Sequence, residues 1–276
     1  MSHLQRTITD RVVRGTCLAF TLLALVPLGS VLLYVIKRGA GALSWSFFAH
    51  LPAPVGEVGG GIGNAIVGTL TLVLVACSFG IPLGVFAGVY LSEFGERRLA
   101  PTVRFCLDVM SGIPSITIGL FVYALIVVPQ KHFSALAGGF ALGILMLPTV
   151  TRTTEELLRL VPDVLREGAL ALGVPRWRAI ISVVLPTAGG GIVTGVMLAV
   201  ARVAGETAPL LFTAFGNQYW ASSLNEPTSS LPMQIFTYAV SPYDEWHAQA
   251  WAAALLLVTL VFVLNVAARL LVRRRA

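Results

Sequence analysis

The chain has 276 residues, of which 56% are hydrophobic and only 12% are charged, and its formal net charge is +6. Soluble domains carry about 25% charged residues, so a soluble fold of this length could not hide so much apolar surface. The apolar residues also fall in blocks of about 20, the length that a helix needs to cross a hydrocarbon core of roughly 30 Å. This composition excludes most soluble enzymes and predicts an all-α polytopic membrane protein.

Six apolar blocks predict about six transmembrane helices within a single transmembrane domain, 1–276. In chain order we expect them at about 17–36, 64–91, 109–129, 133–150, 188–215 and 248–272. The first block follows basic residues, as in a signal peptide, but Lys37-Arg38 stands where a cleavage site would need small residues. We therefore interpret this block as a retained first helix.

Basic residues are divided unequally between the two sides of this arrangement. Lys37, Arg38 and Lys131 lie on one side, and Arg202 lies within a span. The other fifteen lie on the opposite side: Arg6, Arg11, Arg14, Arg97, Arg98, Arg104, Arg152, Arg159, Arg166, Arg176, Arg178, Arg269, Arg273, Arg274 and Arg275. Because cytoplasmic segments carry the excess of Lys and Arg, we expect that side and both termini to face the cytoplasm. Charges at membrane edges suit anionic lipid headgroups, so no nucleic-acid partner is expected.

Small residues in the second span predict close helix packing. Gly80, Gly84 and Gly88 recur every four residues, a spacing that lets helices approach closely in lipid. The pattern is compatible with static packing of a bundle and with a hinge.

No catalytic or metal-binding constellation is evident in the sequence. The histidines lie outside the spans and share no ligand spacing: His3, His50, His132 and His247. The three cysteines also lack disulfide or metal-ligand spacing, and no G-x-x-x-x-G-K-[ST] phosphate loop is present. We therefore expect no enzymatic activity, metal or cofactor in this chain itself.

The stretch 151–186 is too polar to enter the bilayer and has helical spacing of its apolar residues. Pro162 followed by Asp163 suits the start of a helix. Gly173 can end that helix in the left-handed conformation, and Pro175 prevents it from continuing. The pattern predicts a short amphipathic helix between the fourth and fifth spans, with a loop lying on the headgroups as the alternative.

Part of this stretch resembles the cytoplasmic signature E-A-A-x3-G-x9-I-x-L-P of ABC importer permeases. The signature aligns with Glu167, Gly168, Ala169, Gly173, Leu185 and Pro186. Gly168 and Val183 depart from the signature, but both are small or apolar replacements. The resemblance implies a coupling helix that docks into a groove of a separate ATP-hydrolysing subunit.

Two charged residues, Arg202 and Glu206, interrupt the otherwise apolar fifth span. Their i, i+4 spacing places them on one helix face, close enough to pair. A charge at a helix centre costs about 2.5–3.5 kcal/mol on insertion scales, so each should face a partner or water. Arg202 is therefore expected to line a path for an anion, with Glu206 orienting it; the alternative is that Arg202 extends to the outer surface.

Four longer segments resemble one family more closely, the PstA-type membrane subunits of phosphate-specific ABC importers. They read GIPSITIGLFVYAL (112–125), LPTVTRTTEELLRLVP (147–162), ARVAGETAPLLFTA (201–214) and LPMQIFTYAVSP (231–242). The resemblance implies that Arg152 and Arg202 are the basic residues for phosphate passage, with Glu206 as their companion. Arg152, at the cytoplasmic end of the fourth span, has the alternative role of a membrane anchor. Ser115 and Thr117 either line the path or bond to carbonyls of their own helix.

This resemblance implies a type I ABC importer permease fold in the prokaryotic plasma (inner) membrane, with the chain forming half of the path for inorganic phosphate. Its implied partners are a second homologous permease subunit, two ATP-binding subunits that use ATP and Mg, and an extracytoplasmic phosphate-binding protein. The apolar stretch 231–240 predicts a short interfacial helix where that binding protein would dock. An ABC permease for another oxyanion, or a secondary anion carrier, remains the alternative.

Overall fold

The computed structural model describes residues 3–54, 57, 59–95 and 99–273. Helices account for nearly all of the regular structure in this part of the chain, apart from one isolated bridge between Phe215 and Thr228. The four expected cytoplasmic arginines Arg97, Arg98, Arg274 and Arg275 lie outside the described residues.

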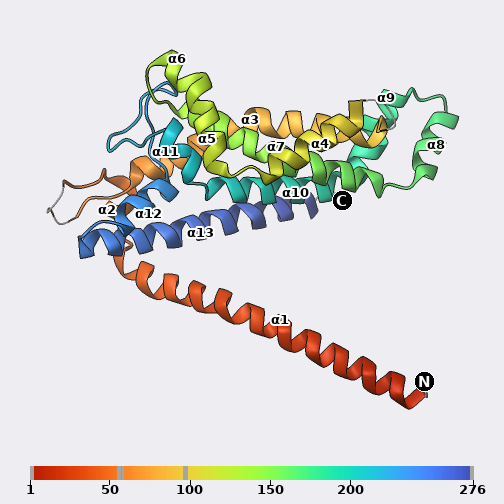
Figure 1. Ribbon diagram of the computed structural model, residues 1–276, viewed down its shortest axis with the longest axis horizontal. Helices are drawn as coiled ribbons and strands as arrows, with labels where there is room; N and C mark the ends of the chain where they lie inside the picture. The colour runs from red at the N-terminus through yellow and green to blue at the C-terminus, as the bar shows by residue number, and fades with distance from the viewer. Residues whose placement is uncertain (1–2, 55–56, 58, 96–98, 274–276) are drawn as a thin grey trace.

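Four long helices lie lengthwise in an elongated bundle (Figure 1): α3 (Gly63–Glu93), α7 (Ala135–Arg159), α10 (Leu185–Ala204) and α13 (Asp244–Arg273). The short helices α8 (Asp163–Ala171) and α9 (Arg176–Ala179) lie at one end of the bundle. At the other end lie α2 (Trp45–Ala49), α12 (Leu231–Ala239) and the loops around 216–230. In the described residues, five helices are long and apolar enough to cross a membrane, and a bent helix pair makes a sixth if it counts as one span.

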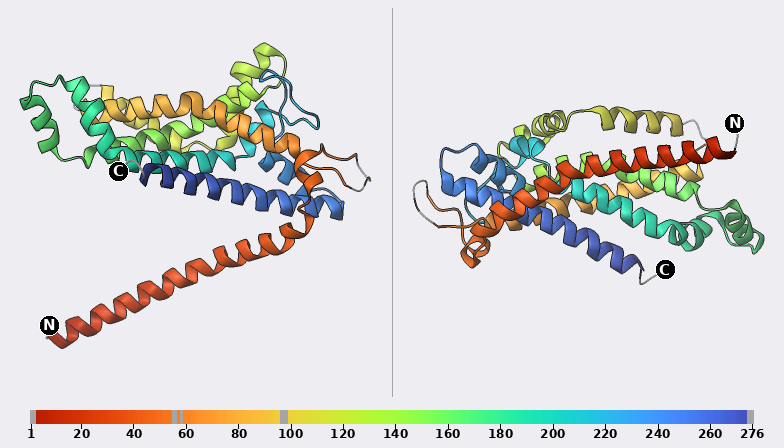
Figure 2. Two further views of the ribbon diagram at one scale, coloured as in Figure 1. Left: turned by 180° about the vertical axis from the view of Figure 1, so that it is seen from behind. Right: turned by 90° about the horizontal axis from the view of Figure 1, so that it is seen from below.

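Helix α1 (His3–Gly39) leaves the bundle at a wide angle (Figures 1 and 2). It touches the bundle near its C-terminal end, where the rings of Tyr34 and Trp251 lie 5.0 Å apart. Most of its apolar side chains are exposed. Lipid or another subunit must therefore cover this helix in a membrane.

The core of the bundle forms where α3, α7 and α10 pack together. A Cβ atom added at Gly84 would lie 2.7 Å from Val150 Cγ1, and one added at Gly88 would lie 2.6 Å from Thr154 Cβ. The small residues of α3 therefore let the backbone of α7 come close, as their spacing predicts. Helix α10 runs antiparallel to α7, since Gly195 faces Thr153 and Gly191 faces Leu157.

The third span differs from the continuous helix predicted at 109–129. Helix α4 (Leu99–Gly112) begins ten residues earlier, and α5 (Ser115–Val122) follows it, continuing through the π-helical turn η2 (Tyr123–Val127) into α6 (Val128–Gln130). The two halves are bent by 104°. Pro114 has no N–H to donate and disfavours helical geometry at the residue before it, so the helix breaks there.

The fourth span also differs, because α7 continues nine residues beyond the predicted end at 150. Thr151, Thr154 and Glu155 are polar but buried in the bundle, with relative exposures of 1%, 1% and 4%. Their polarity placed them outside the predicted span, whereas in the structure they continue α7 and are buried. Within 151–186, only about 160–175 lies outside α7 and the helical run that starts at Arg176.

The fifth span starts earlier and ends earlier than the predicted 188–215. Helices α9, η3 (Ile180–Val184) and α10 form one continuous run from Arg176 to Ala204, and α11 (Ala208–Thr213) follows after a break. Glycine at 205 and proline at 209 both weaken a continuing helix. The sixth span agrees with its predicted position to within four residues.

Candidate functional site

Two helix breaks lie side by side, one between α4 and α5 and the other between α10 and α11. The segments after the breaks touch, because a Cβ atom at Gly119 would lie 2.6 Å from Pro209 Cα. Broken helices expose backbone groups that a membrane tolerates only where protein or a water-filled cavity receives them. The breaks are therefore the first candidate site.

Arg202 and Glu206 flank the second break. Arg202 belongs to the last turn of α10, and Glu206 follows the helix end at Gly205. Arg202 Nε lies 4.0 Å from Glu206 Oε1, so the pair predicted from the spacing forms at the outer limit of an ion pair. The Arg202 side chain is 55% exposed and that of Glu206 is 19% exposed. The guanidinium is thus held loosely and keeps donors for another acceptor.

Arg202 lies near the middle of the bundle rather than at its outer end. Since Gly195 faces Thr153, counting seven residues along α10 and seven back along α7 leads from Arg202 to Met146. The Met146 sulfur lies 3.5 Å from a Cβ atom at Gly80, which is close to the midpoint of α3. A side chain at this depth is far from both ends of α3 and α7, which argues against simple extension to the outer surface.

Arg152 lies inside α7, seven residues before the end of the helix, and not at a cytoplasmic helix end as expected. It forms an ion pair with Asp108 of α4. The side chains are 35% and 62% exposed, respectively. At a rise of 1.5 Å per residue, Arg152 lies about 9 Å closer than Arg202 to the end that carries α8.

Asp108 is a residue that the sequence reasoning missed. The predicted third span began one residue after it, so this carboxylate of α4 was overlooked. Asp108 precedes Gly112, the last residue of α4, by one turn. The first break therefore lies about 6 Å from the level of Arg152, in the direction of Arg202.

Ser115 and Thr117 occupy the first turn of α5, directly after the first break. Ser115 is half-buried and Thr117 is exposed. The Thr117 N–H donates to the Pro114 carbonyl at 2.9 Å. The geometry thus brings the predicted residues of both breaks and Arg152 into the middle part of the bundle, at different depths.

The predicted amphipathic helix is present as α8, which starts at Asp163 after Pro162. Gly173 follows it with φ +78°, the left-handed conformation that ends a helix. Glu167 and Gly168 are exposed, whereas Ala169 is buried against the bundle. The two polar or small positions therefore face outward, as docking to another subunit requires.

Leu185 and Pro186 lie within the continuous helical run, where they begin α10. Pro186 lacks the N–H that an α-helix would need, and the turn before it is the π-helical η3. The proline is thus accommodated by a widened turn directly beneath α8.

Ion pairs fasten α8 to the bundle. Glu93, the last residue of α3, accepts hydrogen bonds from Nε and Nη2 of Arg166 on α8, at 3.2 and 3.1 Å. A second buried carboxylate, Glu155, pairs with Arg104 at 2.8 Å and with Arg159 at 2.7 Å. The sequence reasoning assigned these arginines only to membrane orientation. The partners of Arg166 and Arg104 lie 73 and 51 residues away, so no local pattern could have revealed those two pairs, whereas Glu155 and Arg159 have the i, i+4 spacing of a pair within one helix.

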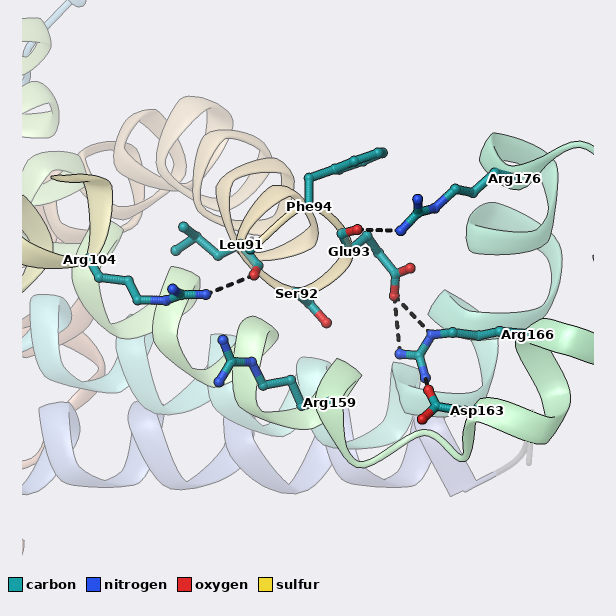
Figure 3. Close-up of a pocket in the computed structure, with 10 residues that line it drawn as sticks. Leu91, Ser92, Glu93, Phe94, Arg104, Arg159, Asp163, Arg166 and Arg176 are labelled. Atoms are coloured by element: carbon teal, nitrogen blue, oxygen red, sulfur yellow. Dashed lines mark hydrogen bonds and ion pairs between the residues drawn. The ribbon is translucent and has the colours of Figure 1, made fainter. Parts of the chain in front are cut away.

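A polar cavity of about 560 Å³ lies among these pairs (Figure 3). The ends of α3 and α7 and the starts of α4, α8 and α9 contribute to its wall. Arg104, Arg159, Arg166 and Arg176 all line it. No group of His, Cys, Asp and Glu suited to a metal ion occurs in the described part of the chain.

Residues 80–276 match the family model described as binding-protein-dependent transport system inner membrane component. The chain is 44% identical to the phosphate transport system permease protein PstA of Yersinia pestis, over 96% of this chain and 90% of that protein. Its identity to the PstA of Haemophilus influenzae is 47%, over 87% and 85% of the two chains. A probable PstA of Methanocaldococcus jannaschii is 38% identical, over 96% and 94%.

Two solved structures have a similar fold. A chain of an inward-facing MetNI methionine ABC transporter has a TM-score of 0.61 and 21% identity, with 78% of this chain and 94% of that chain covered. A chain of a bacterial alginate ABC transporter has a TM-score of 0.69 and 14% identity, with 99% and 97% covered. At these identities the likeness concerns the fold alone.

Proposed function

Because the chain belongs to the family of binding-protein-dependent inner membrane permeases, with PstA phosphate permeases as its relatives, we propose that it forms half of the phosphate path of an ATP-driven importer. Its architecture is that of a type I ABC importer permease. The observation that carries the proposal is a half-exposed arginine, Arg202, near mid-depth of the bundle and beside a helix break.

A path for phosphate needs positive charge at this depth. Phosphate carries one to two negative charges near neutral pH, and a negative-inside potential opposes its entry by about 2.3 kcal/mol per charge per 100 mV. Arg202 supplies a guanidinium whose fork matches phosphate oxygens. Glu206, at 4.0 Å, holds this side chain without neutralising it through a tight pair.

Arg152 would receive the anion next, about 9 Å closer to the end that carries α8. Its pair with Asp108 would have to open when phosphate arrives. Ser115 and Thr117 lie at the start of α5, the end of a helix that carries partial positive charge. In transporters such half-helix N-termini point at anionic groups, which supports a role for both residues along the path.

The coupling segment supports a separate ATPase. Glu167, Gly168, Ala169 and Gly173 form or end α8, and Leu185 and Pro186 stand in the π-widened helix beneath it. We propose that α8 docks on an ATP-binding subunit, which uses ATP and Mg, and that two such subunits serve two homologous permease chains. A phosphate-binding protein would dock at the opposite end, near α12.

The membrane orientation follows from the same arrangement. The described ends of α1 and α13 both point toward the end that carries α8 (Figure 1). This supports an orientation with both termini on the cytoplasmic side of the prokaryotic inner membrane, in agreement with the excess of arginines there.

Uptake of radiolabelled phosphate by cells that carry the whole transport system tests the proposal. We expect Arg202→Gln to lower uptake about 10- to 100-fold at matched membrane abundance, because charge-assisted hydrogen bonds contribute about 1.5–3 kcal/mol. Arg14→Gln is the control, since Arg14 also forms an i, i+4 pair, with Asp10 at 3.8 Å, but on the exposed part of α1.

Unchanged uptake in Arg202→Gln would contradict the assigned path. If wild-type cells accumulated another oxyanion in preference to phosphate, phosphate would be the wrong substrate. The proposal that the chain is a permease subunit would still hold. Uptake that persists with inactivated ATP-binding subunits would indicate a secondary carrier.

A further inference from the structure

The cavity at the end that carries α8 has too few carboxylates for its arginines. Glu155 is shared by Arg104 and Arg159, and Glu93 is taken by Arg166. Within the described residues no carboxylate pairs with Arg176; one of its terminal nitrogens donates to the backbone carbonyl of Glu93, and its guanidinium lies 4.9 Å from the centre of the Phe94 ring. Asp163 also pairs with Arg166, so among the described residues there are three carboxylates for four arginines and positive charge exceeds negative charge.

Several of these guanidiniums also keep unused donors. A guanidinium has five N–H groups. Arg166 is heavily engaged, because it bonds two carboxylates and two backbone carbonyls. In the described part of the chain Arg104 donates to Glu155 and to the Leu91 carbonyl, and Arg159 pairs with Glu155 alone. Donors of Arg104, Arg159 and Arg176 are thus available to a further acceptor.

Ser92 provides a second, independent sign of a missing acceptor. It lines the cavity between Arg104, Arg159 and Arg166 (Figure 3). Its Oγ atom is buried and has no hydrogen-bond partner among the described residues. An unpaired buried hydroxyl costs about 1–3 kcal/mol. A ligand or water that accepts a hydrogen bond from Ser92 would remove this cost.

We propose that this cavity binds a small phosphate-bearing anion. Guanidinium and hydroxyl groups both donate, and phosphate oxygens accept several bonds at once. The volume of about 560 Å³ lies in the range of about 300–1,000 Å³ typical of ligand pockets, so it holds a phosphate group together with its waters or the group that bears it.

A bound anion would act on the coupling helix. The walls of the cavity belong to the bundle helices α3 and α7 on one side and to α8 and α9 on the other. An anion bound among these arginines would add contacts between these two sides. A bound anion would therefore hold α8 more rigidly against the bundle helices. Inorganic phosphate on this side would in that way act as a regulator of the coupling helix. Only the choice of inorganic phosphate as the probe rests on the proposed function.

Equilibrium dialysis of radiolabelled inorganic phosphate against the purified assembly of permease and ATP-binding subunits tests the site. The binding protein is omitted, and all variants carry Arg202→Gln so that binding in the proposed path is weakened. We expect the parent to bind phosphate, Arg176→Gln to weaken binding about tenfold and Ser92→Ala about threefold. Arg178→Gln is the matched control, since Arg178 lies on the same short helix and does not line the cavity.

Absence of phosphate binding in the parent, or equal binding in Arg176→Gln and Arg178→Gln, would overturn the inference. The Arg202→Gln uptake experiment does not depend on this result. The two experiments therefore distinguish an error in the proposed cavity site from an error in the proposed phosphate path. A second arm repeats the dialysis in nanodiscs of phosphatidylglycerol and of phosphatidylcholine. Both results of this arm support the site: loss of phosphate binding in phosphatidylglycerol alone identifies a lipid headgroup as its occupant, and equal binding identifies the free anion.

Discussion

Replacing Glu93 by glutamine tests how the coupling helix α8 is held to the bundle. The Glu93 side chain is 5% exposed and pairs with Arg166, which is 20% exposed. Arg166 also donates to the carbonyls of Leu158 and Val161, at 2.7 and 2.6 Å, and to Asp163 at 3.0 Å. One arginine thus joins α8 to the ends of α3 and α7.

The expected cost follows from the burial of the pair. Removing one partner of a fully buried ion pair costs about 3–5 kcal/mol. Glu93→Gln keeps the volume, and Arg166 retains Asp163 and two carbonyls, so we expect about 2–3 kcal/mol for the detachment of α8. Asp163 is 85% exposed, and Asp163→Asn should therefore cost less than about 1 kcal/mol.

Hydrogen–deuterium exchange of the α8 amides in the assembled transporter measures this difference. If α8 opens locally, 2–3 kcal/mol corresponds to about 30- to 150-fold faster exchange in Glu93→Gln. Asp163→Asn should change the rate less than about fivefold. Equal exchange in the two variants would refute the view that the buried carboxylate, rather than the exposed one, fastens the helix.

Two further predictions concern the packing of the bundle and of its outer end. Gly88→Leu should prevent a stable bundle, because a Cβ atom at this position already lies 2.6 Å from Thr154 of α7. The yield of monodisperse assembly measures this effect. Gly15→Leu is the control and must give a normal yield, because a Cβ atom at Gly15 has open space around it. Thr69→Val should lower the free energy of unfolding by about 1–3 kcal/mol, because the buried Thr69 hydroxyl accepts from the Leu231 N–H at 2.8 Å. Thermal unfolding measures this loss, and a loss as large in Thr71→Val, where the half-buried hydroxyl bonds only the Val67 carbonyl of its own helix, would contradict the explanation.

Local composition was sufficient for the membrane class and for several helices. A span needs about 20 apolar residues, and that requirement is visible in α1, α3 and α13 without any knowledge of their neighbours. The glycines of α3 also predicted close packing correctly, because small residues at intervals of four share one helix face. The motif around Glu167 and Gly173 located α8, and the longer motifs led to the family that the comparisons confirm.

Tertiary structure alone decided which polar residues lie inside the bundle. Thr151 and Glu155 were placed outside the fourth span because of their polarity, whereas both are buried in α7 and Glu155 pairs with Arg104, 51 residues away. The bend at Pro114 could not be predicted from hydropathy, because a block of apolar residues has the same hydropathy whether its helix is straight or bent. The pair of Arg152 with Asp108 and the arginine-lined cavity likewise depend on distant residues, and contacts of that kind have no period that a local sequence pattern can reveal.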